Sequence, residues 1–213
     1  LLYQLAQSGA TGGLVDLLIL RDETGAYNGY SGDVSSIIAA LGFIGGALAV
    51  WSTAKLLITK NKEDMHLSHL KKEGKAKYAL LVAATIGAVI GFNLLFELLG
   101  VTNKSEAYTE VAAQQYSAHF IVGILVFGFI SPIAEELLFR GVIYGYLRRF
   151  MDIKLAIALS ALIFGVYHMN YVQGVYGFLI GCLMAYAYEY FGEFKMAVFV
   201  HVASNVLAYC LSY

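Results

Sequence analysis

The sequence predicts an all-α protein, a polytopic transmembrane bundle with about six helical spans. Hydrophobic residues make up 59% of the 213 residues, only 14% are charged, and there is a single proline. The mean hydropathy is +0.68, which is too apolar for an ordinary soluble domain. Apolar stretches of about 20 residues recur along the chain, and this is the length that a helix needs to cross a hydrocarbon core of about 30 Å.

The predicted spans lie at roughly 35–59, 78–100, 117–148, 153–169, 172–191 and 196–212. We therefore expect residues 34–213 to form one bundle, preceded by an N-terminal segment, residues 1–33, on the outer side. Residue 1 is leucine rather than an initiator methionine, so we expect this segment to be truncated or processed. The third span is too long for one straight crossing, and Ser131-Pro132 is the predicted position of a bend.

The distribution of basic residues predicts the orientation in the cell membrane. Seven of the fourteen lysine and arginine residues lie between Lys55 and Lys77, so the positive-inside rule places the basic loop 60–77 in the cytoplasm. Alternation of the six spans then places Arg148 and Lys195 on the same side. We expect membrane lipids, and no nucleic acid, among the partners of this multi-pass protein.

The third span carries the charged sequence Glu135-Glu136-Leu-Leu-Phe-Arg140. Charges within an apolar span are costly and usually functional. On a helix, Glu136 and Arg140 lie four residues apart on one face, whereas Glu135 is rotated by about 100°. We expect Glu136 and Arg140 to form a supporting ion pair, which leaves Glu135 free to face a different partner.

Two later spans carry further polar side chains at helical spacing. Phe164 and His168 are four residues apart near the end of one span, and His201 and Asn205 are four residues apart on the last. A carboxylate, two imidazoles and an amide can therefore meet in one intramembrane pocket. Counting about 1.5 Å per residue from the basic ends places Glu135 and His168 roughly 20 Å deep, and His201 and Asn205 roughly 9 to 15 Å deep. Helix tilt is needed to close this difference.

Two hydrolytic chemistries suit this set of residues. Glu135, His168 and His201 are suitable ligands for a divalent metal such as zinc, which would activate a bound water. Alternatively, Glu135 acts as a general base on water without a metal, while the histidines and Asn205 stabilise an oxyanion. The non-catalytic reading is that these groups are interhelical polar contacts in a transporter or scaffold. The single-helix zinc motif HExxH is absent.

Pairs of glycines four residues apart recur in the spans, at Gly42/Gly46, Gly87/Gly91 and Gly177/Gly181. Small residues at this spacing let helix backbones approach closely. We interpret all three pairs as packing positions within the bundle.

The motifs Glu135-Glu136-x-x-x-Arg140, Phe164-x-x-x-His168 and His201-x-x-x-Asn205, in this order on successive spans, resemble the CPBP family of CAAX proteases and bacteriocin-processing enzymes, also called the Abi family. The resemblance covers a protease-like core at about 78–213. It does not explain the segment from Glu106 to Gln115.

This resemblance implies an intramembrane endopeptidase acting on hydrophobic or lipidated substrates, either CAAX-type prenylated proteins or bacteriocin and leader peptides. By motif position, Glu135 activates the water, His168, His201 and Asn205 complete the site, and Glu136 and Arg140 support it. The family is associated with both metal-dependent and glutamate-only mechanisms, so both stay open. The alternative function is a catalytically dispensable membrane scaffold that regulates a sensor kinase or confers bacteriocin self-immunity.

Overall fold

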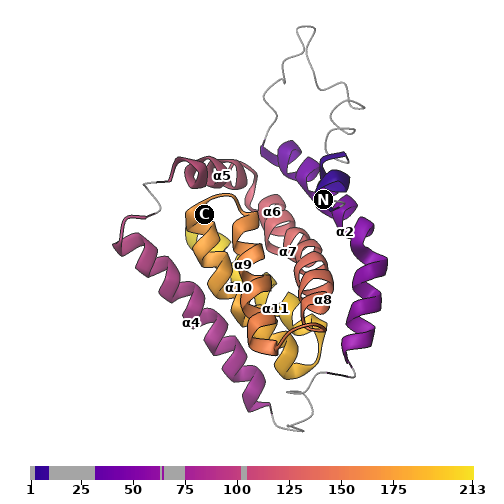
Figure 1. Ribbon diagram of the computed structural model, residues 1–213. Helices are drawn as coiled ribbons and strands as arrows, with labels where there is room; N and C mark the ends of the chain where they lie inside the picture. The colour runs from indigo at the N-terminus through magenta and orange to yellow at the C-terminus, as the bar shows by residue number, and fades with distance from the viewer. Residues whose placement is uncertain (1–2, 10–31, 63, 65–74, 102–104) are drawn as a thin grey trace.

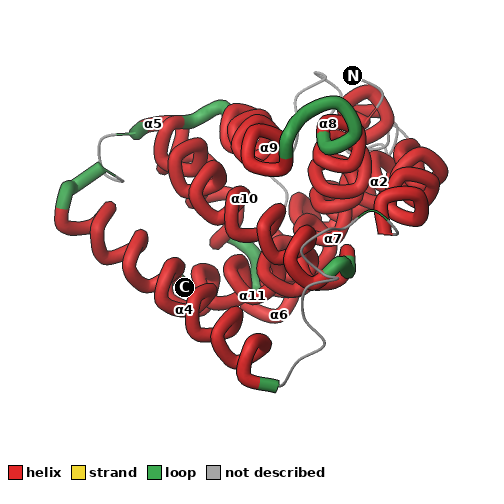
Figure 2. Tube along the Cα trace, turned by 60° about the horizontal axis from the view of Figure 1, so that its bottom comes forward, coloured by secondary structure: helices red, strands yellow, loops and turns green. Residues whose placement is uncertain are grey.

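A computed structural model describes residues 3–9, 32–62, 64, 75–101 and 105–213. All regular secondary structure in these ranges is helical (Figures 1 and 2), which confirms the predicted all-α class. A short helix spans residues 3–9. The longer helices are α2 (Gly32–Lys62), α4 (Ala76–Leu98), α5 (Glu106–Tyr116), α9 (Ile153–Tyr167), α10 (Tyr171–Phe191) and α11 (Phe194–Ser212).

The charged sequence lies on one long helical segment, Phe120–Leu147, whose hydrogen-bond pattern changes along its length. Its parts are α6 (Phe120–Gly123), the π-helical η2 (Ile124–Ile130), α7 (Ser131–Glu136), the π-helical η3 (Leu137–Tyr144) and α8 (Gly145–Leu147). Pro132 lies at the start of α7, inside this continuous segment, where it cannot donate a backbone hydrogen bond to the preceding turn. Around the predicted bend, the segment stays helical and switches between α and π patterns, a feature common at functional sites.

Four helices among the described residues are long and apolar enough to cross a membrane: α2, α4, the segment Phe120–Leu147, and α11. The predicted fourth span corresponds to α9, which has 15 residues and, at about 1.5 Å per residue, is shorter than a hydrocarbon core. The predicted fifth span corresponds to α10, which has 21 residues but is not among those four helices. The count of six spans therefore stays a prediction.

Helices α9 and α10 form the most extensive helix pair. His168 ends α9, and Met169 adopts a left-handed conformation (φ 56°) that is uncommon for a residue with a side chain. Asn170 then begins α10 by accepting a hydrogen bond from the Gln173 backbone N–H. Gly165 and Gly174 face each other so closely that a Cβ on Gly165 would overlap the Gly174 carbonyl group. This tight turn fixes His168 at the end of α9.

Figure 1 shows α2 and α4 on opposite sides of a central group formed by α6 to α11. Helix α2 packs on η3 and α7, and α4 packs chiefly on α11. The largest fully buried side chains include the charged residues Glu136, Arg140 and Glu189. The centre of the bundle is therefore partly ionic.

Two sequence expectations lie partly outside the described residues. Residues 10–31 of the predicted N-terminal segment are not described, and neither are residues 63 and 65–74 of the basic loop. Lys60 and Lys62 lie in the last turn of α2. The orientation in the membrane stays a prediction.

Candidate active site

Glu136 and Arg140 form the predicted ion pair, and both side chains are 0% exposed. The Arg140 Nη1 atom donates to Glu136 Oε1 at 2.6 Å, and Nη2 donates to the Gly181 carbonyl oxygen at 3.0 Å. The guanidinium also lies over the Phe164 ring, 4.7 Å from its centroid. Buried charges need such partners to offset desolvation, so this pair anchors the segment Phe120–Leu147 to α9 and α10.

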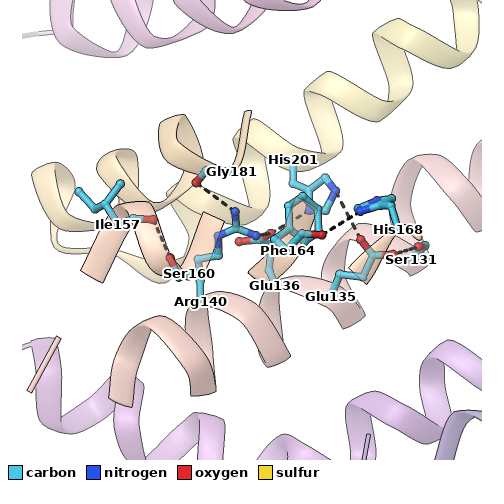
Figure 3. A network of polar contacts seen from close by, with 10 residues as sticks. All are labelled: Ser131, Glu135, Glu136, Arg140, Ile157, Ser160, Phe164, His168, Gly181 and His201. Carbon is cyan, nitrogen blue, oxygen red and sulfur yellow. Dashed lines mark hydrogen bonds and ion pairs between the residues drawn. The ribbon is translucent and has the colours of Figure 1, made fainter. Parts of the chain in front are cut away.

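His201 lies between the two glutamates, as Figure 3 shows. Its Nδ1 atom is 2.8 Å from Glu136 Oε1, and its Nε2 atom is 3.7 Å from Glu135 Oε2. An ionised carboxylate only accepts hydrogen bonds, so the Nδ1–H group of His201 donates a hydrogen bond to Glu136. The second distance is too long for a direct hydrogen bond, but one water molecule can donate to both Nε2 and Oε2.

Glu135 is held by its own helix and faces the cavity. The Ser131 hydroxyl donates to Glu135 Oε1 at 2.6 Å, and the residue is only 7% exposed. One carboxylate oxygen is therefore fixed by Ser131, while Oε2 lies near His201. Sequence reasoning missed Ser131, although its position four residues before Glu135 placed it on the same helical face.

Phe164 separates the two imidazoles. Its ring makes edge-on contacts with His168 and His201, at centroid distances of 4.8 and 5.3 Å. His168 Nδ1 lies 2.9 Å from the Phe164 carbonyl oxygen, so Nδ1 is the donor and the neutral ring keeps a lone pair on Nε2. The motif Phe164-x-x-x-His168 thus fixes both the position and the tautomer of His168.

A cavity of about 820 Å³ brings the four predicted catalytic side chains together: Glu135, His168, His201 and Asn205 all line it. Its apolar lining includes Phe127, Ile180 and Met184, which lowers the local dielectric. Asn205 Nδ2 donates to the Phe127 carbonyl oxygen at 3.0 Å, which fixes the amide and leaves its second N–H. The predicted convergence of three helices on one cavity is therefore present.

The fit to a metal was tested on the same residues. No group of three His, Cys, Asp or Glu side chains in the described ranges is arranged to hold a metal ion. The set Glu135, His168 and His201 is thus not assembled as a three-ligand site in this structure. We derive no step through a metal, and metal dependence stays a prediction.

A second buried ionic network surrounds Glu189. Glu189 accepts hydrogen bonds from the Tyr144 hydroxyl at 2.7 Å and from Arg148 Nε and Nη2 at 2.7 and 2.8 Å. Arg148 also donates to the Asp64 carbonyl oxygen. Sequence reasoning did not single out Glu189, because its partners are more than forty positions away.

Comparison with known protein families gives a match for part of the chain. Residues 117–207 match the family described as "Type II CAAX prenyl endopeptidase Rce1-like". No curated protein and no solved structure matches the chain. The matched range contains all seven motif residues of the resemblance, from Glu135 to Asn205, and excludes α2, α4 and α5. Over residues 117–207, the chain is therefore similar to the Rce1-like family of type II CAAX prenyl endopeptidases.

Proposed function

We propose that this membrane protein hydrolyses peptide bonds of hydrophobic or lipidated substrates with a water molecule activated by Glu135. The observation that carries the proposal is the pair of acceptors at the cavity, Glu135 Oε2 and His201 Nε2, 3.7 Å apart. The match of residues 117–207 to the Rce1-like family supports an intramembrane endopeptidase activity. The role of Glu135 and the substrate class are our proposals.

In the proposed reaction, one water donates a hydrogen bond to Glu135 Oε2 and one to His201 Nε2. Glu135 takes the first proton while the water oxygen attacks the carbonyl carbon of the peptide bond, which gives a tetrahedral oxyanion. Glu135 then gives that proton to the leaving nitrogen, and the C–N bond breaks. The products are one free carboxyl and one free amine, so the water is fully accounted for.

The surrounding residues position these groups and stabilise charge. Ser131 holds Oε1, which keeps Oε2 directed to the water. Glu136 fixes His201 through Nδ1, and Arg140 donates a hydrogen bond to the same carboxylate. The second N–H of Asn205 is a donor for the oxyanion, an interaction worth about 2.7–4 kcal/mol in comparable sites. His168, whose Nδ1 is engaged by the Phe164 carbonyl oxygen, completes the site with Nε2 as a hydrogen-bond acceptor.

The test is a cleavage assay in liposomes with two substrate sets, prenylated CAAX peptides and small hydrophobic leader peptides, with and without a chelator. We expect the parent protein to cleave one set and Glu135→Gln to be inactive but folded, because glutamine keeps the volume and removes the base. Glu110→Gln, an exposed residue of α5, is the matched control and should keep full activity.

Three outcomes would contradict the proposal. Turnover by Glu135→Gln would remove the general base. No cleavage of either set by the parent protein would favour the scaffold function. Activity that is lost with chelator and restored by a divalent metal would replace the metal-free step with metal-activated water.

A further inference from the structure

Four glutamines are part of the polar lining of the active-site cavity, beside five tyrosines. Gln4 and Gln7 come from the helix at residues 3–9, Gln115 from α5 and Gln173 from α10. We call these four residues the glutamine wall. Among the described lining residues there is no lysine or arginine, and Glu135 is the one carboxylate. Apart from the catalytic groups, the described wall of the cavity is neutral and rich in amides.

The helix at residues 3–9 is anchored beside the site. Tyr3 is 2% exposed and packs with Val50, Ala54 and Leu137. A Cβ on Gly46 would lie only 2.8 Å from the Tyr3 ring, so α2 accepts this ring because residue 46 is glycine. The Tyr167 hydroxyl donates to Gln7 Oε1 at 3.2 Å, which ties the helix to α9 next to His168. This part of the wall lies outside the range that matches the family.

Gln173 is oriented by the start of α10. Its Oε1 atom accepts a hydrogen bond from Asn170 Nδ2 at 2.6 Å, and its backbone N–H donates to Asn170 Oδ1 at 2.8 Å. Because the side-chain oxygen is already engaged, the NH₂ group of Gln173 is the part left to bind an acceptor in the cavity.

A peptide that enters an apolar cavity loses water from its backbone N–H and C=O groups, and these must find partners. A sheet edge is one common solution, but the described residues contain no strand. Side-chain amides carry the same donor and acceptor groups as the peptide backbone. An anionic group, by contrast, would meet Glu135 without a lining cation at low dielectric.

We propose that the glutamine wall binds the main chain of an extended, uncharged segment of the substrate beside Glu135, with Gln4 and Gln173 as direct contacts and Gln7 as a positioning residue for Tyr167. Recognition of a free terminal carboxylate then has no part in binding. This inference rests on the proposed function and specifies its substrate.

The test compares Gln4→Met, Gln173→Met and the double variant, because methionine keeps the side-chain length and removes the amide. Gln114→Met, an exposed position of α5 outside the cavity lining, is the matched control. We expect KM to rise about two- to tenfold for each wall variant, the effect of one lost hydrogen bond. The value of kcat should stay within about threefold, since the catalytic groups are unchanged.

Substrate backbone changes separate binding from a structural effect. In a series of peptides with single ester-for-amide replacements away from the scissile bond, the ester that faces Gln173 should raise KM of the parent protein and leave KM of Gln173→Met unchanged. The carboxamide and free-acid forms of one peptide should be cleaved with equal kcat/KM. Fluorescence anisotropy of the same peptides on Glu135→Gln should show the same pattern in Kd.

An unchanged KM and Kd in both wall variants would overturn the inference, and so would ester effects that are equal in every variant or a strict requirement for the free carboxylate. Absence of cleavage by the parent protein would instead count against the proposed function. The anisotropy measurements still decide the binding role in that case, so the two failures are distinguishable.

Discussion

Replacing Arg140 by methionine tests whether the buried ion pair supports the site. In the parent protein Glu136 and Arg140 are both 0% exposed. Methionine fills much of the space of the arginine but removes the partner of Glu136, and it also breaks the hydrogen bond to Gly181. Removing one partner of a buried pair costs about 3–5 kcal/mol. His201 still contacts Glu136, so we expect a loss of about 3 kcal/mol in the free energy of unfolding.

The assay is unfolding in mixed micelles by titration with a denaturing detergent, for Arg140→Met, Glu136→Gln and the double variant. The double variant contains neither charge, so it should be more stable than the sum of the single losses predicts, by about 1–3 kcal/mol of coupling. Arg149→Met is the control, because Arg149 is exposed. Its stability should stay within about 0.5 kcal/mol of the parent.

Two results would refute this reasoning. Single variants as stable as the parent would mean that the charges are not desolvated. Strictly additive losses in the double variant would mean that Glu136 and Arg140 do not interact. Either result would also remove the support that we assign to His201.

Three further predictions concern the site and its packing. Asn205→Ala should lower kcat by about 10²–10³-fold with little change in KM, because the oxyanion that its amide stabilises exists only after water attack. Steady-state kinetics on the folded variant check this, and an equal change in KM would point to ground-state binding instead. Gly165→Ala should destabilise the bundle by about 1–3 kcal/mol, because its Cβ would overlap the α10 backbone. Gly87→Ala, with no described atom within 4 Å of the new Cβ, should gain up to about 1 kcal/mol from helix propensity. Thermal stability in detergent should therefore be lower for Gly165→Ala than for Gly87→Ala. Arg148→Met should lower the stability in detergent by about 3 kcal/mol, since it leaves Glu189 buried without its cation. The folded fraction of this variant should keep the kcat of the parent protein. A matching loss of kcat would place Glu189 in the catalytic machinery.

The glycine pairs show how one pattern can have different meanings. Gly46 contacts Tyr3, and Gly177 and Gly181 lie close to α9, as the packing interpretation requires. Gly87 has the same spacing to Gly91, yet a Cβ at either position meets no atom of the described residues within 4 Å. Spacing defines a smooth helix face, but whether another helix covers that face depends on the arrangement of the bundle.

Local helical geometry explains why much of the site could be predicted. The Glu136–Arg140 pair and the edge-on contact of Phe164 with His168 join residues four positions apart. A period of 3.6 residues places such residues on one face in any helix. Hydropathy likewise identified the helices, because an apolar stretch of sufficient length is required to cross a membrane.

Only the tertiary structure decided which helix faces meet. It placed His201 between Glu135 and Glu136, brought the helix at residues 3–9 to the cavity, and gave Glu189 its partners. These contacts join residues far apart in the chain and depend on helix tilt and rotation, which packing against neighbours determines and composition does not. The sequence by itself thus determined the helices, the motif residues and their local pairs, whereas the assembled acceptor pair and the amide lining exist only in the packed bundle.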